Sequence, residues 1–252
     1  MNKLSNCIKN KDSSYIPVWF MRQAGRYLPE FKEIRKKNQN FIKLCLNPQL
    51  VKEITLQPKK RFNLDATIIF SDILMVPYGL GQIVEFKKNL GPVLEKFQIE
   101  EILKQDHNNF IKKISPVYES ISEVKKITKE ESLIGFVGAP WTLLVYMLNR
   151  RSPKKEFKFN RIIENENLVG RLLNKLVDTI CLHIKKQVEA GANIIQIFDS
   201  WAGLLPKDKL STYCYDPTLK IVEYTKSLKV PTICFPKGIG ENYENFCSIV
   251  KP

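Results

Sequence analysis

The chain has 252 residues, 44% of them hydrophobic, which is enough to bury one sizeable core. Lysine and arginine outnumber aspartate and glutamate by 40 to 26, and the resulting net charge of +14 suits either a nucleic-acid surface or an anionic small ligand. The positive charge is spread along the sequence in short runs, so it indicates a basic solvated surface rather than a block dedicated to a polyanion.

The cysteine and histidine patterns exclude a tight metal or disulfide framework. Six cysteines are scattered without a Cys-x-x-Cys motif, and His107 and His183 lie outside any ligand-like motif. We therefore expect reduced thiols in a cytoplasmic protein. Residues 1–11 lack the apolar region of a signal peptide, and the low-charge stretches 66–84 and 133–148 contain proline and glycine. A soluble protein with no membrane span and no metal site is the expectation.

The first half of the chain begins with a polar lead-in at residues 1–16. Beyond it, hydrophobic periodicity predicts the following elements: helices at 31–37, 48–62, 99–105 and 108–128, and a buried β-branched strand at 65–72. Prolines and glycines between residues 77 and 92 indicate a long connection up to Phe97.

The second half alternates apolar strands with amphipathic helices. The predicted elements are strands at 133–138, 194–198 and 230–235, helices at 143–149, 167–190 and 217–227, and a basic loop at 150–158. This alternation predicts a parallel sheet, either in a barrel or in a doubly wound fold. No G-x-G-x-x-G motif follows a strand, which disfavours a dinucleotide site. Asp72, the Gly-Ala-Pro-Trp turn and Asp199-Ser200 follow strands, at the ends where barrel active sites lie.

The segment that the rest of the chain can be organised around is Pro17–Glu30, with the sequence PVWFMRQAGRYLPE. Arg22 and Arg26 flank Gln23, Ala24 and Gly25, and two permanently charged guanidinium groups suit a ligand with several carboxylates or phosphates. Gly25 and Ala24 allow the backbone to approach a ligand closely. The spacing alone fits equally a basic turn at the end of an edge strand.

Four stretches together resemble the uroporphyrinogen decarboxylase family of haem biosynthesis. They are PVWFMRQAGRYLPEF at residues 17–31, IFSDIL at 69–74, GFVGAPWTL at 135–143 and FDSWAG at 198–203. The resemblance runs from about Pro17 to about Gly238 and implies a TIM-type (β/α)8 barrel. It also implies decarboxylation of the four acetate arms of uroporphyrinogen III to methyl groups, giving coproporphyrinogen III, with no metal or organic cofactor.

The resemblance assigns roles to particular residues of this chain. Arg22 through Arg26 grip substrate carboxylates, and Arg22 is also placed among the catalytic groups. Asp72 holds the pyrrole N–H groups and stabilises positive charge on the ring, while Tyr146 and Ser200 hydrogen-bond carboxylates. By residue type alone, Asp72 fits a strand-end cap, Tyr146 a core aromatic and Ser200 a turn serine. The proton donor stays open.

The chain departs from the family pattern at its end. Only four clear strands are found by Pro252, whereas a closed barrel needs eight, and no histidine matches the late histidine of the family. We therefore expect one α/β-barrel domain over 1–252 that lacks its last strands and helices. The resemblance implies a homodimer when the chain is full length.

Two other interpretations remain open. A corrinoid- or thiol-dependent methyltransferase of the same superfold would need a zinc site built from histidine and cysteine. A basic nucleic-acid-binding protein is motivated by the +14 charge, yet the chain carries no recognised nucleic-acid motif, so no nucleic-acid partner is expected.

Overall fold

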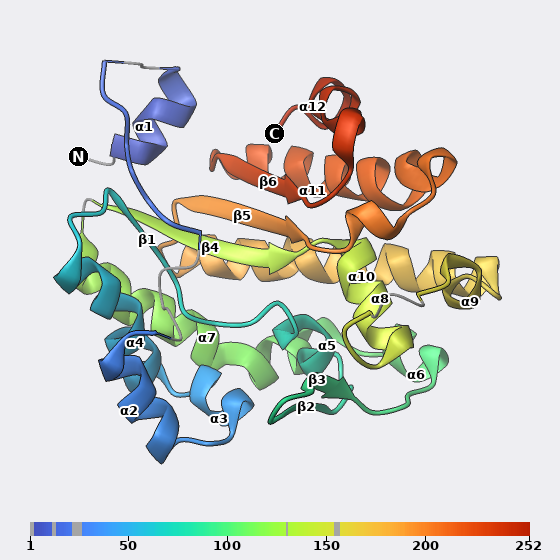
Figure 1. Cartoon of the computed structure of the whole chain (residues 1–252), viewed down its shortest axis with the longest axis horizontal. Coiled ribbons are helices and arrows are strands. Elements are labelled where there is room, and N and C mark those ends of the chain that lie inside the picture. Colours follow the sequence, from blue (N-terminus) through green and yellow to red (C-terminus); the bar gives the residue numbers. More distant parts are fainter. Residues whose placement is uncertain (1–2, 12–13, 22–26, 130, 154–156) are drawn as a thin grey trace.

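The fold is built around a parallel sheet, as the alternation of strands and helices predicts (Figure 1). The computed structural model describes residues 3–11, 14–21, 27–129, 131–153 and 157–252. In these ranges four strands form one sheet in the order β1-β4-β5-β6, and every neighbouring pair is parallel. Their bounds are β1 Ala66–Ile68, β4 Ser132–Gly138, β5 Ile194–Asp199 and β6 Thr232–Pro236. The strand predicted at 65–72 is therefore much shorter than expected.

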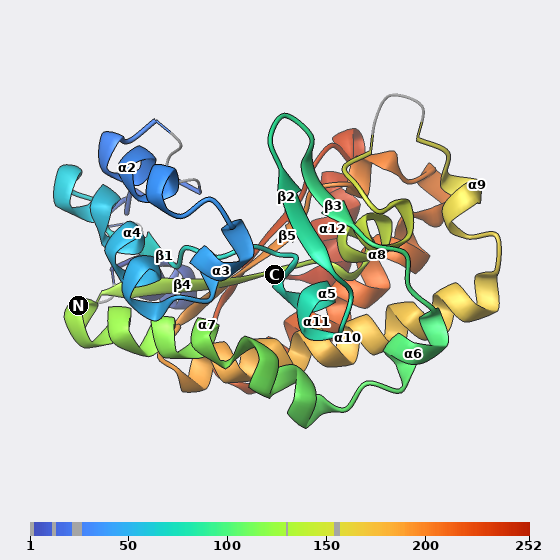
Figure 2. The same ribbon diagram turned by 90° about the horizontal axis from the view of Figure 1, so that it is seen from below.

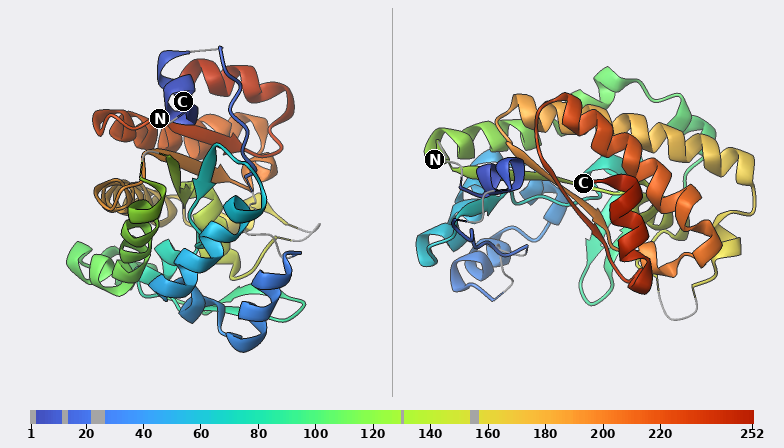
Figure 3. Two further views of the ribbon diagram at one scale, coloured as in Figure 1. Left: turned by 90° about the vertical axis from the view of Figure 1, so that its left-hand side faces the viewer. Right: turned by 90° about the horizontal axis from the view of Figure 1, so that it is seen from above.

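Four helices cover the outer face of this sheet, as the views from the side and from above show (Figure 3). They are α4 Pro48–Arg61, α7 His107–Thr128, α10 Glu166–Glu189 and α11 Asp216–Ser227, all close to their predicted ranges. The side chains of Asn47, Asp106 and Asn165 accept backbone N–H bonds at the starts of α4, α7 and α10. Such caps satisfy donors that a helix end otherwise leaves unpaired.

The outer layer is largely an apolar core that also contains a buried pair of polar side chains. Leu172 and Ile180 of α10 are fully buried. His183 of the same helix lies 3.0 Å from the Tyr118 hydroxyl of α7 through its Nδ1 atom. Complete burial lowers the pKa of His183 to about 3, because a charged imidazolium would lose its hydration there. His183 is thus a neutral core histidine.

The side chain of Gln187 on α10 compensates for the shortness of β1. Its amide accepts a hydrogen bond from the Phe136 N–H at 3.0 Å and donates one to the Phe136 carbonyl at 3.0 Å. These backbone groups of β4 face the side on which β1 has already ended, and buried backbone groups need partners. Gln187 therefore supplies the hydrogen bonds to the Phe136 backbone that a longer β1 would otherwise provide.

The opposite, inner face of the sheet is covered differently. Residues 1–16 were expected to be only a polar lead-in, but they contain α1 (Lys3–Asn10). Leu4 of α1 joins a small apolar cluster with Ala66, Ile68, Ile134 and Ile194, against which the half-buried Trp19 and Phe136 pack. The Ser5 N–H also donates to the Ser132 hydroxyl at 3.3 Å. The sequence did not predict this helix, because only a few of its residues are apolar and they give little helical periodicity.

The remaining elements lie around the ends of the sheet (Figure 2). They are α2 Pro29–Lys37, α3 Phe41–Cys45, α5 Met75–Gly79, α6 Ile99–Leu103, α8 Pro140–Asn149, α9 Phe159–Ile162 and α12 Tyr243–Val250, with the antiparallel hairpin β2 Val84–Lys87 and β3 Gly91–Leu94. The long connection predicted at residues 77–97 in fact contains α5 and this hairpin. Its turn uses Asn89 and Gly91 at positive φ, which glycine and asparagine tolerate best.

The described residues establish a parallel α/β fold and leave the closed barrel as a prediction. Strands β1, β4, β5 and β6 neighbour one another in chain order, with helices on the outer face, which is the arrangement of consecutive units in a (β/α) barrel. None of the helices in the described part of the chain combines the length and the apolar character needed to cross a bilayer.

Candidate active site at the strand ends

The ends of β4 and β5 are joined by a buried polar cluster. Thr142, in the first turn of α8, donates its hydroxyl to Asp199 Oδ1 at 2.6 Å and accepts the Trp201 N–H at 3.0 Å. The Ala139 N–H donates to the Phe198 carbonyl at 2.8 Å, and the Trp141 indole donates to the Trp201 carbonyl at 3.0 Å. The residues at the start of α8 therefore fix the backbone on either side of Ser200.

Asp199 is the unusual member of this cluster, because its carboxylate is buried. Burial raises its pKa to about 6, against the opposing hydrogen bond from Thr142. The Cys214 thiol lies beside it, and burial together with the charge of Asp199 raises the pKa of that thiol. Oδ2 of Asp199 receives no nitrogen or oxygen donor from the described residues. Sequence reasoning singled out the Asp199-Ser200 pair but not the contact with Thr142.

The turn after β5 also fits closely against the turn after β6. The Gly203 N–H donates to the Lys237 carbonyl at 3.0 Å, and the Lys237 N–H donates to the Asp199 carbonyl at 3.0 Å. A Cβ atom on Gly203 would lie 2.5 Å from the Gly238 carbonyl oxygen, so only glycine fits there. The two strand ends are thereby held in register.

A cavity of about 760 Å³ lies over these strand ends, and we call it the strand-end cavity. Its size is within the ordinary range for small-ligand sites. The lining residues come from stretches far apart in the sequence: Phe20, Met21, Tyr27, Tyr146, Ser152, Phe198, Ser200, Trp201, Phe235 and Lys237. No carboxylate is among them, and Lys237 supplies a positive charge, so the described lining favours an anionic ligand with apolar parts.

Two residues expected from the sequence, Tyr146 and Ser200, are brought together in this cavity. Tyr146 is half-buried on α8, and its ring packs against that of Trp201 at a centroid distance of 5.9 Å. Ser200 follows Asp199 directly, so its position depends on the buried cluster below it. The aromatic and hydroxyl groups thus face one space from two different strand ends.

The predicted carboxylate-binding residues Arg22, Gln23, Ala24, Gly25 and Arg26 lie outside the described residues. Their roles therefore stay predictions. Of the described residues next to them in sequence, Met21 and Tyr27 line the strand-end cavity.

Asp72 follows the last residue of β1 by four positions and is not among the residues that line the cavity. Its Oδ1 atom accepts the Leu74 N–H at 2.8 Å, and its carbonyl accepts the Met75 N–H at 3.1 Å, at the start of α5. This local bond has the form of a cap. Burial, with a smaller contribution from the Asp72 charge, raises the pKa of the Cys45 thiol, so the carboxylate lies near Cys45.

Sequence reasoning missed several lining residues. Lys237 follows β6 directly, so the strand-end rule could have found it. Phe198 and Phe235 are in register on neighbouring strands, which places both rings on the inner face. The Trp201 indole N–H is buried without an acceptor in the described part of the chain. Tyr27 lies within the PVWFMRQAGRYLPEF stretch but was not assigned a role, and Ser152 carried no signal in the sequence.

The described residues contain no group of three or more histidine, cysteine, aspartate or glutamate side chains that could hold a metal ion. All six cysteines are free thiols.

The chain was then compared with known proteins. A family model described as uroporphyrinogen decarboxylase (URO-D) matches residues 1–249. Proteins named uroporphyrinogen decarboxylase from Rickettsia akari (strain Hartford), Rickettsia bellii (strain RML369-C) and Rickettsia canadensis (strain McKiel) are 43%, 44% and 45% identical to it over 251 residues. These alignments cover 98% of this chain and 74%, 73% and 74% of the respective relatives.

A solved structure supports the fold independently. A methyltransferase from Methanosarcina mazei superposes with a TM-score of 0.72, covering 92% of this chain and 68% of that chain at 16% sequence identity. At that identity the likeness concerns the fold alone. The fold and cavity define a parallel α/β protein with a candidate ligand site at the carboxyl ends of its strands. The chain belongs to the uroporphyrinogen decarboxylase family.

Proposed function

We propose that this chain is a carboxy-lyase that converts the four acetate side chains of uroporphyrinogen III to methyl groups, giving coproporphyrinogen III in haem biosynthesis. In each step an acetate arm loses CO2 and its methylene carbon takes up one proton. The observation that carries the proposal is that Tyr146 and Ser200 line one cavity whose described lining includes Lys237 and no carboxylate. This cavity occurs in a chain 43–45% identical to proteins named uroporphyrinogen decarboxylase.

The chemistry requires a place for the electrons that the departing CO2 leaves behind. A pyrrole ring protonated at carbon becomes an electron-poor cation and accepts these electrons. A fixed carboxylate near the pyrrole N–H groups stabilises that cation, and preorganised charge of this kind is often the largest catalytic contribution. We assign this role to Asp72, whose carboxylate is held in place by the Leu74 N–H.

The substrate carboxylates need donors and positive charge. Arg22 and Arg26 are assigned to them because a guanidinium group binds a carboxylate through two parallel hydrogen bonds. Gln23, Ala24 and Gly25 complete this binding segment. The hydroxyls of Tyr146 and Ser200 serve as further donors, and both residues line the strand-end cavity. Lys237 adds a cation at the same site.

Four further features belong to the same proposal. The reaction proceeds on the protein's own residues without a metal or organic cofactor, and the parallel sheet is part of a TIM-type barrel. The protein acts in the cytoplasm as a homodimer.

The relatives extend beyond the part that this chain matches, since the alignments cover 73–74% of their length.

The experiment is an anaerobic assay with uroporphyrinogen III, in which the porphyrins are oxidised afterwards and separated by their number of carboxylates. We expect stepwise loss of four carboxylates by the wild-type chain. Asp72→Asn should lower the rate by about 10²-fold or more, because the neutral amide cannot stabilise the cationic ring. Asp208→Asn, at an exposed position away from the cavity, is the matched control and should retain full activity. A wild-type chain without product would refute the function, whereas near-normal turnover by Asp72→Asn would refute only the role of Asp72.

A further inference from the structure

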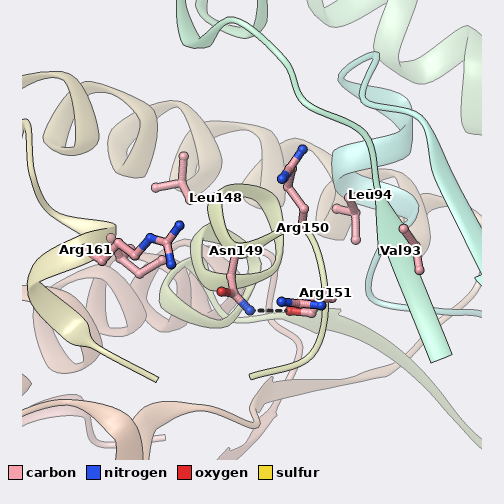
Figure 4. A pocket seen from close by; sticks show the side chains of 8 residues that line it. Val93, Leu94, Leu148, Asn149, Arg150, Arg151 and Arg161 are labelled. Carbon is pink, nitrogen blue, oxygen red and sulfur yellow. Dashed lines mark hydrogen bonds between the residues drawn. The ribbon is translucent and has the colours of Figure 1, made fainter. Parts of the chain in front are cut away.

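A second hollow, lined by arginines, lies beyond the end of α8 (Figure 4). It has a volume of about 390 Å³, and its walls come from β3, from α8 and the loop after it, and from α9. Arg150, Arg151 and Arg161 supply three positive charges, Asn149 adds an amide, and Leu94 and Leu148 provide apolar surface. We call this hollow the arginine pocket. None of the residues assigned to the proposed function lines it.

The loop that carries Arg150 and Arg151 is held firmly by backbone bonds. Arg150 has a left-handed φ of 60° and ends α8 by donating its N–H to the Tyr146 carbonyl at 2.8 Å. Its carbonyl accepts the Leu94 N–H at 2.8 Å, and Arg151 forms an antiparallel bridge with Val93. The amide of Asn149 donates to the Arg151 carbonyl at 2.9 Å. The pocket wall is therefore a fixed part of the fold.

Arginines reach the pocket from separate directions. Arg161 extends from α9 toward Asn149, and Asn149 lies between Arg161 and Arg151 in the close-up view (Figure 4). Arg150 points to another side of the same loop (Figure 4). In this view the side chains of Arg151 and Arg161 lie on either side of Asn149, whereas Arg150 points away from them.

The described residues provide no carboxylate partner for these guanidinium groups. No carboxylate oxygen of the described part of the chain lies within 4.0 Å of the guanidinium nitrogens of Arg150, Arg151 or Arg161, whereas Arg61 pairs with Glu30 at 2.6 Å. Guanidinium groups bind carboxylate and phosphate groups through paired hydrogen bonds.

We infer that the arginine pocket is a second anion-binding site, outside the strand-end cavity, for a small ligand bearing several carboxylate or phosphate oxygens. The chemistry shared by these two ligand types is a compact cluster of negatively charged oxygen atoms. Ser152, the residue after Arg151, lines the strand-end cavity, so the two sites are neighbours along the chain. The inference does not depend on the proposed decarboxylation.

Binding is tested by calorimetry at low ionic strength, with citrate and inorganic phosphate as separate probes. The background is an Arg22→Ala/Arg26→Ala chain, so that the arginines assigned to the strand-end cavity do not contribute. We expect saturable binding of one equivalent of at least one probe, weakened at least tenfold by Arg151→Ala/Arg161→Ala. Tighter binding of citrate would identify a polycarboxylate ligand, and tighter binding of phosphate a phosphorylated one.

Arg171→Ala is the matched control, because Arg171 is a described arginine of α10 that lines neither hollow. It should leave the affinity unchanged. The inference is overturned by an absence of saturable binding, by unchanged affinity in the double arginine variant, or by an equal loss in the Arg171 control. If the double variant does not fold by circular dichroism, Arg161→Gln alone is measured, and a loss of less than threefold counts against the site.

Discussion

The outer layer of helices and the strand-end cavity lie against the same sheet but are held together by different interactions. Behind the sheet, α7 and α10 pack through fully buried apolar side chains such as Leu172 and Ile180, and the one buried histidine stays neutral. At the strand ends, polar groups hold the backbone: Thr142, Asp199 and the turn at Gly203 fix each other through single hydrogen bonds. Extensive apolar burial stabilises the outer layer, whereas a few specific hydrogen bonds set the geometry of the strand ends.

The largest loss of stability is expected from a substitution in the outer layer of helices. Leu172→Ala removes a fully buried side chain from α10 and should lower the free energy of unfolding by about 2–5 kcal/mol, because it leaves a cavity in a close-packed core. Urea unfolding followed by circular dichroism measures this. Leu90→Ala, at a position 67% exposed, should change the value by less than about 0.5 kcal/mol. Equal losses in the two variants would contradict the view that the outer layer is the stabilising core.

The next effect concerns the charge buried at the strand ends. Folding raises the pKa of Asp199 from 3.8 to about 6. The folded chain therefore binds the proton of the Asp199 carboxyl group more tightly than the unfolded chain does. The folded state is thus favoured below pH 4, and this advantage is lost as the pH rises to about 6. At about 1.4 kcal/mol per pKa unit, the group accounts for roughly 3 kcal/mol.

Asp199→Asn removes this dependence and keeps an oxygen that can accept the Thr142 hydroxyl. The difference in unfolding free energy between variant and wild type should therefore shift by about 2 kcal/mol in favour of the variant between pH 4 and pH 7. Taking the difference cancels His183, whose lowered pKa destabilises the folded state as the pH falls below 6.5. A difference that does not change with pH would show that Asp199 is ionised in the folded chain throughout this range.

The smallest effects come from two glycines, one in each region. Gly203→Ala would bring a methyl group to 2.5 Å from the Gly238 carbonyl oxygen and should cost about 1–3 kcal/mol. Gly170→Ala in α10 meets no atom within 4 Å and should stabilise the chain by up to about 1 kcal/mol. Thermal unfolding of the two variants gives the signs directly. A neutral Gly203→Ala would mean that the two strand-end turns can move apart.

Much of the helical and strand order followed from the sequence, because each long element buries a regular apolar stripe. The periodicity of 167–190 and the caps of α4 and α10 specify these helices locally. Helix α1, α5 and the β2–β3 hairpin were missed, since their short segments are stabilised by contacts with distant residues. For α1 the decisive contact is Leu4 on the inner face of the sheet.

Two features of this chain can be read from its sequence alone: the family, through the stretches that resemble its motifs, and the order in which strands and helices alternate. The resemblance to the family, not the spacing of residues, singled out Tyr146 and Ser200. Three arrangements depend on the folded chain: Thr142 bonds Asp199, Lys237 and Ser152 line the same cavity, and the Arg151 and Arg161 side chains lie on either side of Asn149 in the view of the second hollow. These arrangements join segments tens of residues apart, and the physical reason is that packing, not local pattern, brings such segments together.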